Sequence, residues 1–152
     1  MYLGIQIHQQ NVITKAQFGH SLTQRLYDRY FQTSKDREYA EFMAKDWNSD
    51  NLTPSESWRV QMAILTYLVD IFDVYDKVNA GLVDKSHLDT RMRTLKLGVM
   101  KTTNARLVWR GWKRNRSEEF INWFEEEIFS EDDQNSFTPE EIEKLGELNT
   151  MR

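Results

Sequence analysis

The sequence predicts an all-α protein: an irregular single-domain bundle of five to seven helices around a long central helix at about 54–80. Apolar residues recur at three- and four-residue spacings along the chain, and no segment shows the two-residue period of a strand. Only two prolines and six glycines occur in 152 residues, mostly where a helix should begin or end. A chain of this length suits one domain with a core of its own.

The first third of the chain predicts one long helix and one short helix. The long helix is expected from about Ile5 to Phe31. Its apolar stripe consists of Val12, Ala16, Gly19, Leu22, Leu26 and Tyr30. The short helix follows a polar break at 34–36, and the residues on its apolar face are Tyr39, Phe42, Met43 and Trp47.

The central helix has the clearest boundaries. Thr53 can cap its start, Pro54 suits the first helical position, and Glu56 completes a capping box. Gly81 predicts its end, because glycine readily adopts the left-handed conformation that closes a helix. Apolar residues cover more than half of its circumference, so we expect other helices to surround it.

Three more helices are expected before residue 130. One starts at Ser86, one covers about 104–113, and one follows a cap at Ser117. Residues 1–129 are therefore expected to form the helical bundle domain. For residues 130–152 we expect an acidic linker and a weakly anchored C-terminal helix.

The charges form two adjacent blocks. Residues 101–116 include six cations and no acid, and residues 117–133 include eight acids and no base. The blocks can pair with each other, or one of them can recruit a charged partner. The candidate interaction surface consists of five cations of the basic block: Arg106, Arg110, Lys113, Arg114 and Arg116.

The helical phase of the basic block favours pairing within the chain or plain solvation. Alternating tryptophan and arginine can bind phosphates and stack on bases. The phase, however, turns Trp109 and Trp112 to the interior and Arg106 and Arg110 away from it. A protein partner or an anionic membrane surface comes next. Nucleic acid is the least favoured partner, in keeping with the net charge of −4.

The remaining polar residues show no recognisable catalytic or metal-binding pattern. The sequence has no cysteine, which excludes thiol catalysis and cysteine-based zinc sites. Asp84 and His87 form a single acid-x-x-His pair, whereas a di-iron bundle needs two and further glutamates. No Gly-x-Ser-x-Gly pattern or glycine-rich phosphate loop occurs. We therefore expect no catalytic residue, no metal and no cofactor, and no small-molecule substrate is identified.

The acids of the central helix leave one alternative open. Asp70 and Asp73 are three residues apart, and paired carboxylates can perform acid–base chemistry if burial raises one pKa. A solvated strip, with Lys77 offsetting Asp73, is the favoured interpretation. A single acid turned inward to accept hydrogen bonds is the next. An enzyme with a carboxylate-based site is thus the second alternative function.

Several motifs occur in a familiar order over roughly residues 20–129. They are Leu52-Thr53-Pro54-Ser55-Glu56, Phe72 to Tyr75, Ala80-Gly81-Leu82, Trp112 and Ser117-Glu118-Glu119-Phe120-Ile121. This order resembles a loosely defined family of small all-helical bacterial proteins of unknown function, in which an N-terminal membrane helix often precedes the helical region. The resemblance supplies no reaction or ligand. It implies that the apolar start at 1–7 is the tail of a shortened anchor.

The leading expectation is therefore a non-enzymatic helical protein-interaction or scaffold module, either cytoplasmic or associated with a membrane. Its partner is expected to be another protein or a second copy of the chain. The first alternative is binding of nucleic acid or an anionic surface through residues 101–116.

Overall fold

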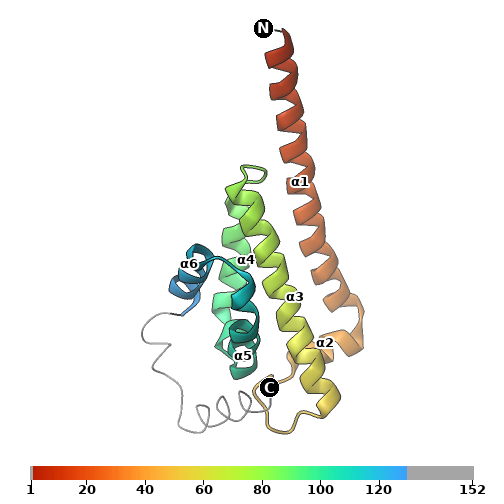
Figure 1. Cartoon of the computed structure of the whole chain (residues 1–152). Helices are drawn as coiled ribbons and strands as arrows, with labels where there is room; N and C mark the ends of the chain where they lie inside the picture. The colour runs from red at the N-terminus through yellow and green to blue at the C-terminus, as the bar shows by residue number, and fades with distance from the viewer. Residues whose placement is uncertain (1, 130–152) are drawn as a thin grey trace. The chain divides into compact units, whose positions relative to one another are not determined.

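The computed structural model of the protein describes residues 2–129, and this part of the chain is all-α, as predicted (Figure 1). Six α-helices and two short 3-10 helices occur in it, without a strand. The helices are α1 Tyr2–Lys35, α2 Arg37–Ala44, α3 Pro54–Asn79, α4 Ser86–Leu97, η1 Val99–Lys101, α5 Thr103–Trp112, η2 Lys113–Asn115 and α6 Glu118–Ile128. The predicted linker and C-terminal helix at 130–152 lie outside the described residues.

Helix boundaries marked by capping residues are confirmed. The Thr53 hydroxyl accepts a hydrogen bond from the Glu56 backbone N–H at 3.2 Å, at the start of α3. Gly81 follows α3 with φ 71°, and the Leu82 N–H donates back to the Lys77 carbonyl at 2.9 Å. The Ser117 hydroxyl accepts from the Phe120 N–H at 3.2 Å at the start of α6.

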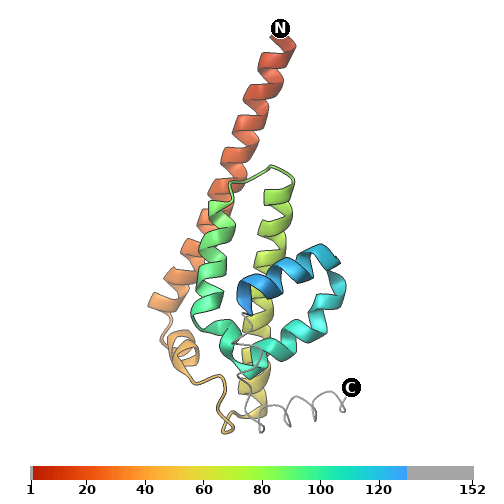
Figure 2. The ribbon, with the colours of Figure 1, turned by 90° about the vertical axis from the view of Figure 1, so that its left-hand side faces the viewer.

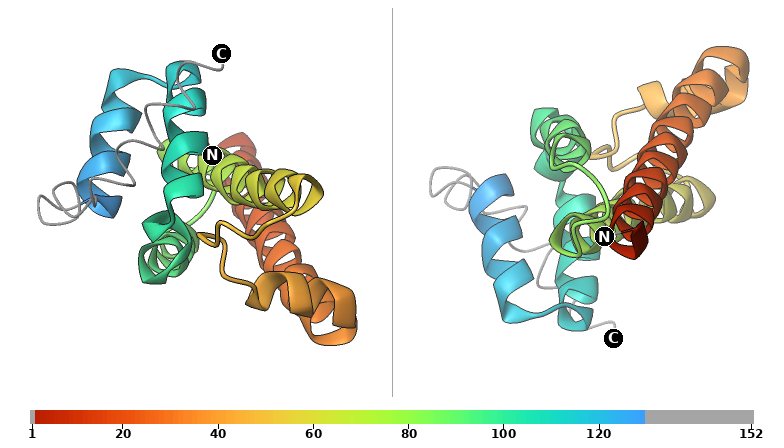
Figure 3. Two further views of the ribbon diagram at one scale, coloured as in Figure 1. Left: turned by 90° about the horizontal axis from the view of Figure 1, so that it is seen from below. Right: turned by 90° about the horizontal axis from the view of Figure 1, so that it is seen from above.

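The helices form two compact units, and α3 and α4 contribute residues to both. Unit 1 consists of the chain up to Asp46 together with Asp70–Arg91. It contains α1, α2, the C-terminal part of α3 and the first turns of α4, which Figures 2 and 3 show from the side and along the helices. Its buried apolar residues are Leu22, Phe42, Ile71, Val74, Val83 and Leu88.

The helix α1 departs from the prediction. Leu22 is its only buried residue, and every residue from 2 to 13 is exposed. Within unit 1 its N-terminal part extends past the turn at 80–85 (Figures 1 and 2). The predicted inward stripe is only partly correct: Leu22 is buried and Gly19 and Leu26 are half-buried, but Val12, Ala16 and Tyr30 are exposed.

Unit 2 consists of Trp47–Val69 and the chain from Met92 onwards. It contains the N-terminal part of α3, the end of α4, α5 and α6. Most of its core is aliphatic and aromatic, formed by Trp47, Val60, Ile64, Leu68, Met92, Leu95, Met100, Ala105, Val108, Trp109, Phe120, Phe124 and Ile128. Trp47 follows the end of α2 instead of lying on its face, and its carbonyl accepts a hydrogen bond from Asn104 Nδ2 at 2.7 Å.

The central position of α3 is only partly as predicted. Its buried apolar residues run through both units and are Val60, Ile64, Leu68, Ile71 and Val74. Trp58, Met62 and Val69, in contrast, are exposed. The helix is therefore not enclosed on all sides. None of the helices in residues 2–129 combines the length and hydropathy that a membrane span requires.

Candidate interaction surface

The structure does not gather the five predicted cations on one surface. Arg106 is buried, and the carbon at the centre of its guanidinium lies 5.2 Å from the centroid of the Phe129 ring. Arg116 is half-buried, with the same carbon 4.4 Å from the centroid of Phe120. The prediction that Arg106 faces solvent is therefore wrong. Attraction to an aromatic face and burial of the apolar stem make an inward arginine favourable there.

The remaining three cations have different surroundings. Lys113 Nζ donates to Glu125 Oε1 at 3.1 Å, and this pair links the basic block to the acidic one within unit 2. Arg110 and Arg114 are exposed. Because both members of the Lys113–Glu125 pair are about a third exposed, water screens the pair, and it contributes about 0–1 kcal/mol.

The two tryptophans of α5 have opposite outcomes. Trp109 is buried, as predicted, with its ring centroid 4.3 Å from that of Phe124. Its indole N–H donates to Glu125 Oε1 at 3.0 Å. Trp112 is 40% exposed, so its predicted inward position is wrong. Trp112 is the last residue of the α-helix.

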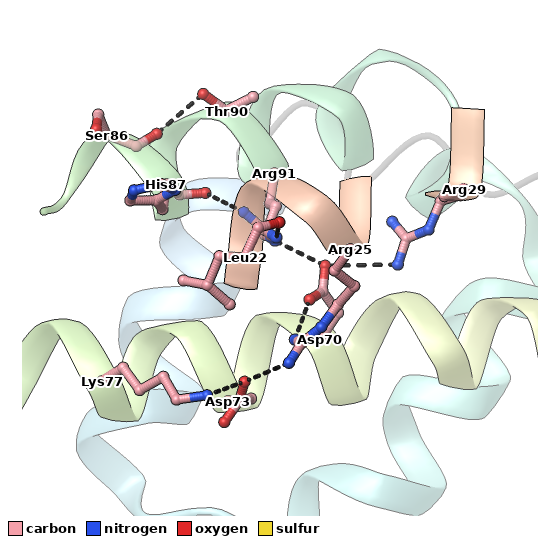
Figure 4. Close-up of polar contacts among 10 residues, drawn as sticks. All are labelled: Leu22, Arg25, Arg29, Asp70, Asp73, Lys77, Ser86, His87, Thr90 and Arg91. Carbon is pink, nitrogen blue, oxygen red and sulfur yellow. Dashed lines mark hydrogen bonds and ion pairs between the residues drawn. The ribbon is translucent and has the colours of Figure 1, made fainter. Parts of the chain in front are cut away.

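Unit 1 contains a buried carboxylate, Asp70, with several arginine partners. The sequence left open whether this residue is solvated or faces the interior. Asp70 of α3 is 5% exposed. Its Oδ1 accepts from Arg25 Nη1 at 2.7 Å and its Oδ2 from Arg91 Nε at 2.8 Å (Figure 4). Arg29 Nη2 lies 3.5 Å from Oδ2. The interpretation of Asp70 as part of a solvated strip is therefore wrong. The alternative, a single acid turned inward to accept hydrogen bonds, is correct.

Arg91 completes this network from α4. Its side chain is 2% exposed, and its Nη1 and Nη2 donate to the carbonyls of His87 at 3.1 Å and Leu22 at 3.0 Å. The guanidinium therefore binds α1 through Leu22 and α3 through Asp70 (Figure 4). A buried ion pair with this many hydrogen bonds fixes the positions of the helices that supply it.

Asp73 lies at the edge of the same network. It accepts from Arg25 Nη2 at 3.1 Å and from Lys77 Nζ at 2.8 Å, so the predicted Asp73–Lys77 pair is present. Partial burial alone would raise the pKa of Asp73. The hydrogen bonds and charges of Lys77 and Arg25 outweigh that effect and hold the pKa below its ordinary value.

The network is suited to positioning helices rather than to catalysis. The carboxylate oxygens of Asp70 are already occupied by strong guanidinium donors. Asp84, the acid of the acid-x-x-His pair, accepts from the Ser86 N–H at 3.1 Å at the start of α4, and hydrogen bonds from Ser86 lower its pKa. No cluster of three or more potential metal-binding side chains occurs within residues 2–129.

The exposed face of α1 is the surface that the sequence analysis missed. At 3.6 residues per turn, one face of this helix carries Tyr2, Ile5, Gln9, Val12, Ala16, His20, Thr23, Tyr27 and Tyr30. All of them are exposed, and none is an acid, a lysine or an arginine. We call this surface the uncharged face. The opposite face carries Leu22, Arg25 and Arg29, which contact the rest of unit 1.

A charge count would have found this surface. Between residues 2 and 24 the only charged side chain is Lys15, whereas 29% of the whole chain is charged. An exposed helix so poor in charge is unusual, because exposed helix faces normally carry charged and polar residues.

No family model matches the chain, and neither a curated protein nor a solved structure matches it. The resemblance to small helical bacterial proteins therefore rests on the short motifs alone.

Proposed function

We propose that the protein is a non-enzymatic interaction module that binds a helix of another polypeptide through the uncharged face of α1. The observation that carries this proposal is the exposure of large apolar side chains along one side of a helix. Tyr2 is 77% exposed, and Ile5 and Val12 are each more than half exposed. Several large apolar side chains exposed along one helix are typical of an interaction site.

The chemistry of the uncharged face selects a helix as the partner. Its side chains recur at alternating three- and four-residue steps, which is the spacing that lets two helices interlock. Aromatic and aliphatic residues alternate with glutamine, histidine and threonine, so the matching surface is apolar with uncharged polar groups. A strongly charged partner would gain no ion pair on this face and would lose hydration.

A membrane surface suits α1 less well than a protein does. Helices that lie in a membrane interface carry lysine and arginine on their polar side, where they contact anionic lipids. The first 23 residues of α1 have Lys15 alone for that purpose. The absence of cysteine suits a reducing compartment, and we expect the module to act in the cytoplasm.

The alternatives from the sequence receive no support from the described residues. Nucleic-acid binding needs the cations of the basic block on one surface, and Arg106 is buried. Carboxylate-based catalysis needs an accessible acid, and Asp70 is enclosed by arginines. Both stay predictions of the sequence.

A site-specific photo-crosslinker tests the proposal. The crosslinker replaces Val12, on the uncharged face, and in a control replaces Asn11, which is exposed on the other side of the same helix. In the producing cells we expect a discrete protein adduct from position 12 and none from position 11. Equal labelling from both positions, or no adduct from a protein of unchanged helicity, would refute the proposal.

A further inference from the structure

The uncharged face has an internal symmetry. From Ala16 toward the N-terminus the face residues follow at steps of 4, 3, 4 and 3, and from Ala16 toward the C-terminus the steps are again 4, 3, 4 and 3. The spacing of the face residues is therefore the same when read in either direction from Ala16. Reversal about Ala16 exchanges Tyr2 with Tyr30, Ile5 with Tyr27, Gln9 with Thr23, and Val12 with His20.

From this symmetry we infer that the helix bound by the uncharged face is α1 of a second copy, in an antiparallel arrangement with its two-fold axis at Ala16. The inference rests on the proposed function and names its partner. An interface between identical chains related by a two-fold axis must be complementary to itself. The reversed face meets this condition: aromatic rings oppose aromatic or aliphatic side chains, Gln9 opposes Thr23, and the smallest residue opposes itself.

Charge and size agree with self-association. A second copy brings no acid, lysine or arginine to the uncharged face, so like charges do not oppose each other although each chain has a net charge of −4. The large apolar residues on this face or at its edge are Tyr2, Ile5, Val12, Ile13, Tyr27, Tyr30 and Phe31, each 49–77% exposed. At about 100 Å² each they offer roughly 700 Å², close to the ~800 Å² that each partner buries in a stable interface.

The antiparallel direction follows from where unit 1 contacts α1. Contacts that hold α1 to the rest of the unit include those of Leu22, Arg25 and Arg29, in its C-terminal half, whereas residues 2–13 are exposed. In an antiparallel pair of α1 helices, the remaining parts of unit 1 from the two copies lie at opposite ends of the helix pair. In a parallel pair they lie side by side. The opposed helix dipoles also favour the antiparallel arrangement.

Introducing a charge at the proposed two-fold axis tests the inference in the purified full-length protein. In a dimer centred on Ala16, the variant Ala16→Glu places two carboxylates against each other. Because such a contact costs several kcal/mol, we expect the dissociation constant from sedimentation equilibrium to rise about 100-fold or more. Asn11→Glu, with the same added charge on the other side of the helix, should leave the constant nearly unchanged.

Mixing variants removes the ambiguity of a misfolded mutant. Ala16→Glu and Ala16→Lys should each be monomeric, and their mixture should form a dimer, because residue 16 of one copy meets residue 16 of the other. A mixture that stays monomeric, while the unaltered protein is a dimer, would overturn the inference.

Cysteine crosslinking decides the direction, and the natural absence of cysteine makes each introduced thiol unique. Ile5→Cys and Tyr27→Cys should form a disulfide with each other when mixed, and neither should form one alone. Disulfides from each variant alone would indicate a parallel pair and overturn the proposed arrangement.

Failure of this inference and failure of the proposed function are distinguishable. A monomeric protein that is crosslinked at position 12 to a different polypeptide keeps the function and overturns the second copy as partner. A protein that dimerises only after residues 130–152 are removed has that segment on the face, which also overturns the inference. A dimer that tolerates Ala16→Glu uses another surface and overturns it as well.

Discussion

At the scale of single residues, the fold of unit 1 depends on one buried charge. Asp70→Asn removes the carboxylate while Arg91 remains buried. We expect a loss of about 3–5 kcal/mol in the free energy of unfolding, measured by urea denaturation, because an uncompensated buried charge is costly. The same change at Asp76, an exposed acid of the same helix, should cost less than about 1 kcal/mol. Equal losses would show that Asp70 is not the determining group.

Asp73 gives unit 1 a pH dependence with a definite sign. Its pKa in the folded protein is below the ordinary value, so the unfolded chain takes up the proton first as the pH falls. The stabilisation is therefore complete above the ordinary aspartate pKa of about 3.9 and is lost as the pH falls through the lower folded value. We expect Asp73→Asn to flatten the acid side of a stability-against-pH curve. An unchanged acid side would contradict this assignment.

Residue by residue, the sequence predicted apolar burial better than polar burial. Leu22 and Trp109 lie in the interior, as their helical phase indicates. Asp70 and Arg106 are also inside, and a pattern of hydrophobic residues cannot detect them. Their burial depends on partners far away in the sequence: Arg25 is 45 residues from Asp70. Periodicity contains no information about such pairs.

At the scale of elements, helix ends marked by capping residues were predicted correctly. Helix ends without a recognisable capping residue were misplaced. The start of α3 at Pro54 and of α6 after Ser117 were predicted because a side chain binds a free backbone N–H there. α1 has no acidic residue in its first turn, and both of its ends were misplaced. Its orientation was only partly predicted: Leu22 of the stripe faces inward, but Arg25 and Arg29 share the inward face, and half of the apolar stripe is exposed.

The exposed start of α1 leads to a prediction about stability. Residues 2–13 are all exposed, so their removal takes away little burial within the chain. In the Ala16→Glu background, where the proposed dimer cannot contribute, we expect the free energy of unfolding to change by less than about 1 kcal/mol. A matched variant, Leu22→Ala, removes the one buried side chain of α1 and should cost about 2–5 kcal/mol. Both values come from urea denaturation. A large loss on removing 2–13 would show that this segment is part of the core.

At the scale of the whole molecule, fold class was predictable and function was not. A helical period throughout 152 residues is sufficient to indicate an all-α protein. The proposed interaction surface depends on what remains exposed after folding: the lack of charge in 2–24 can be read from the sequence, but which side of α1 is exposed cannot. The charge blocks at 101–133 predicted an interaction surface in unit 2, but Lys113 of the basic block pairs with Glu125 of the acidic block.

Salt dependence separates the proposed function from the electrostatic alternatives. Association through the uncharged face brings together two chains of charge −4, so added salt screens only a weak repulsion. Between about 50 and about 500 mM salt we expect the dissociation constant of the dimer to stay constant or fall, as measured by sedimentation equilibrium. Binding of a polyanion through Arg110 and Arg114 would instead weaken steeply over the same range, because it releases counterions. A dimer that dissociates as salt rises would therefore depend on opposite charges, and the uncharged face would not be its interface.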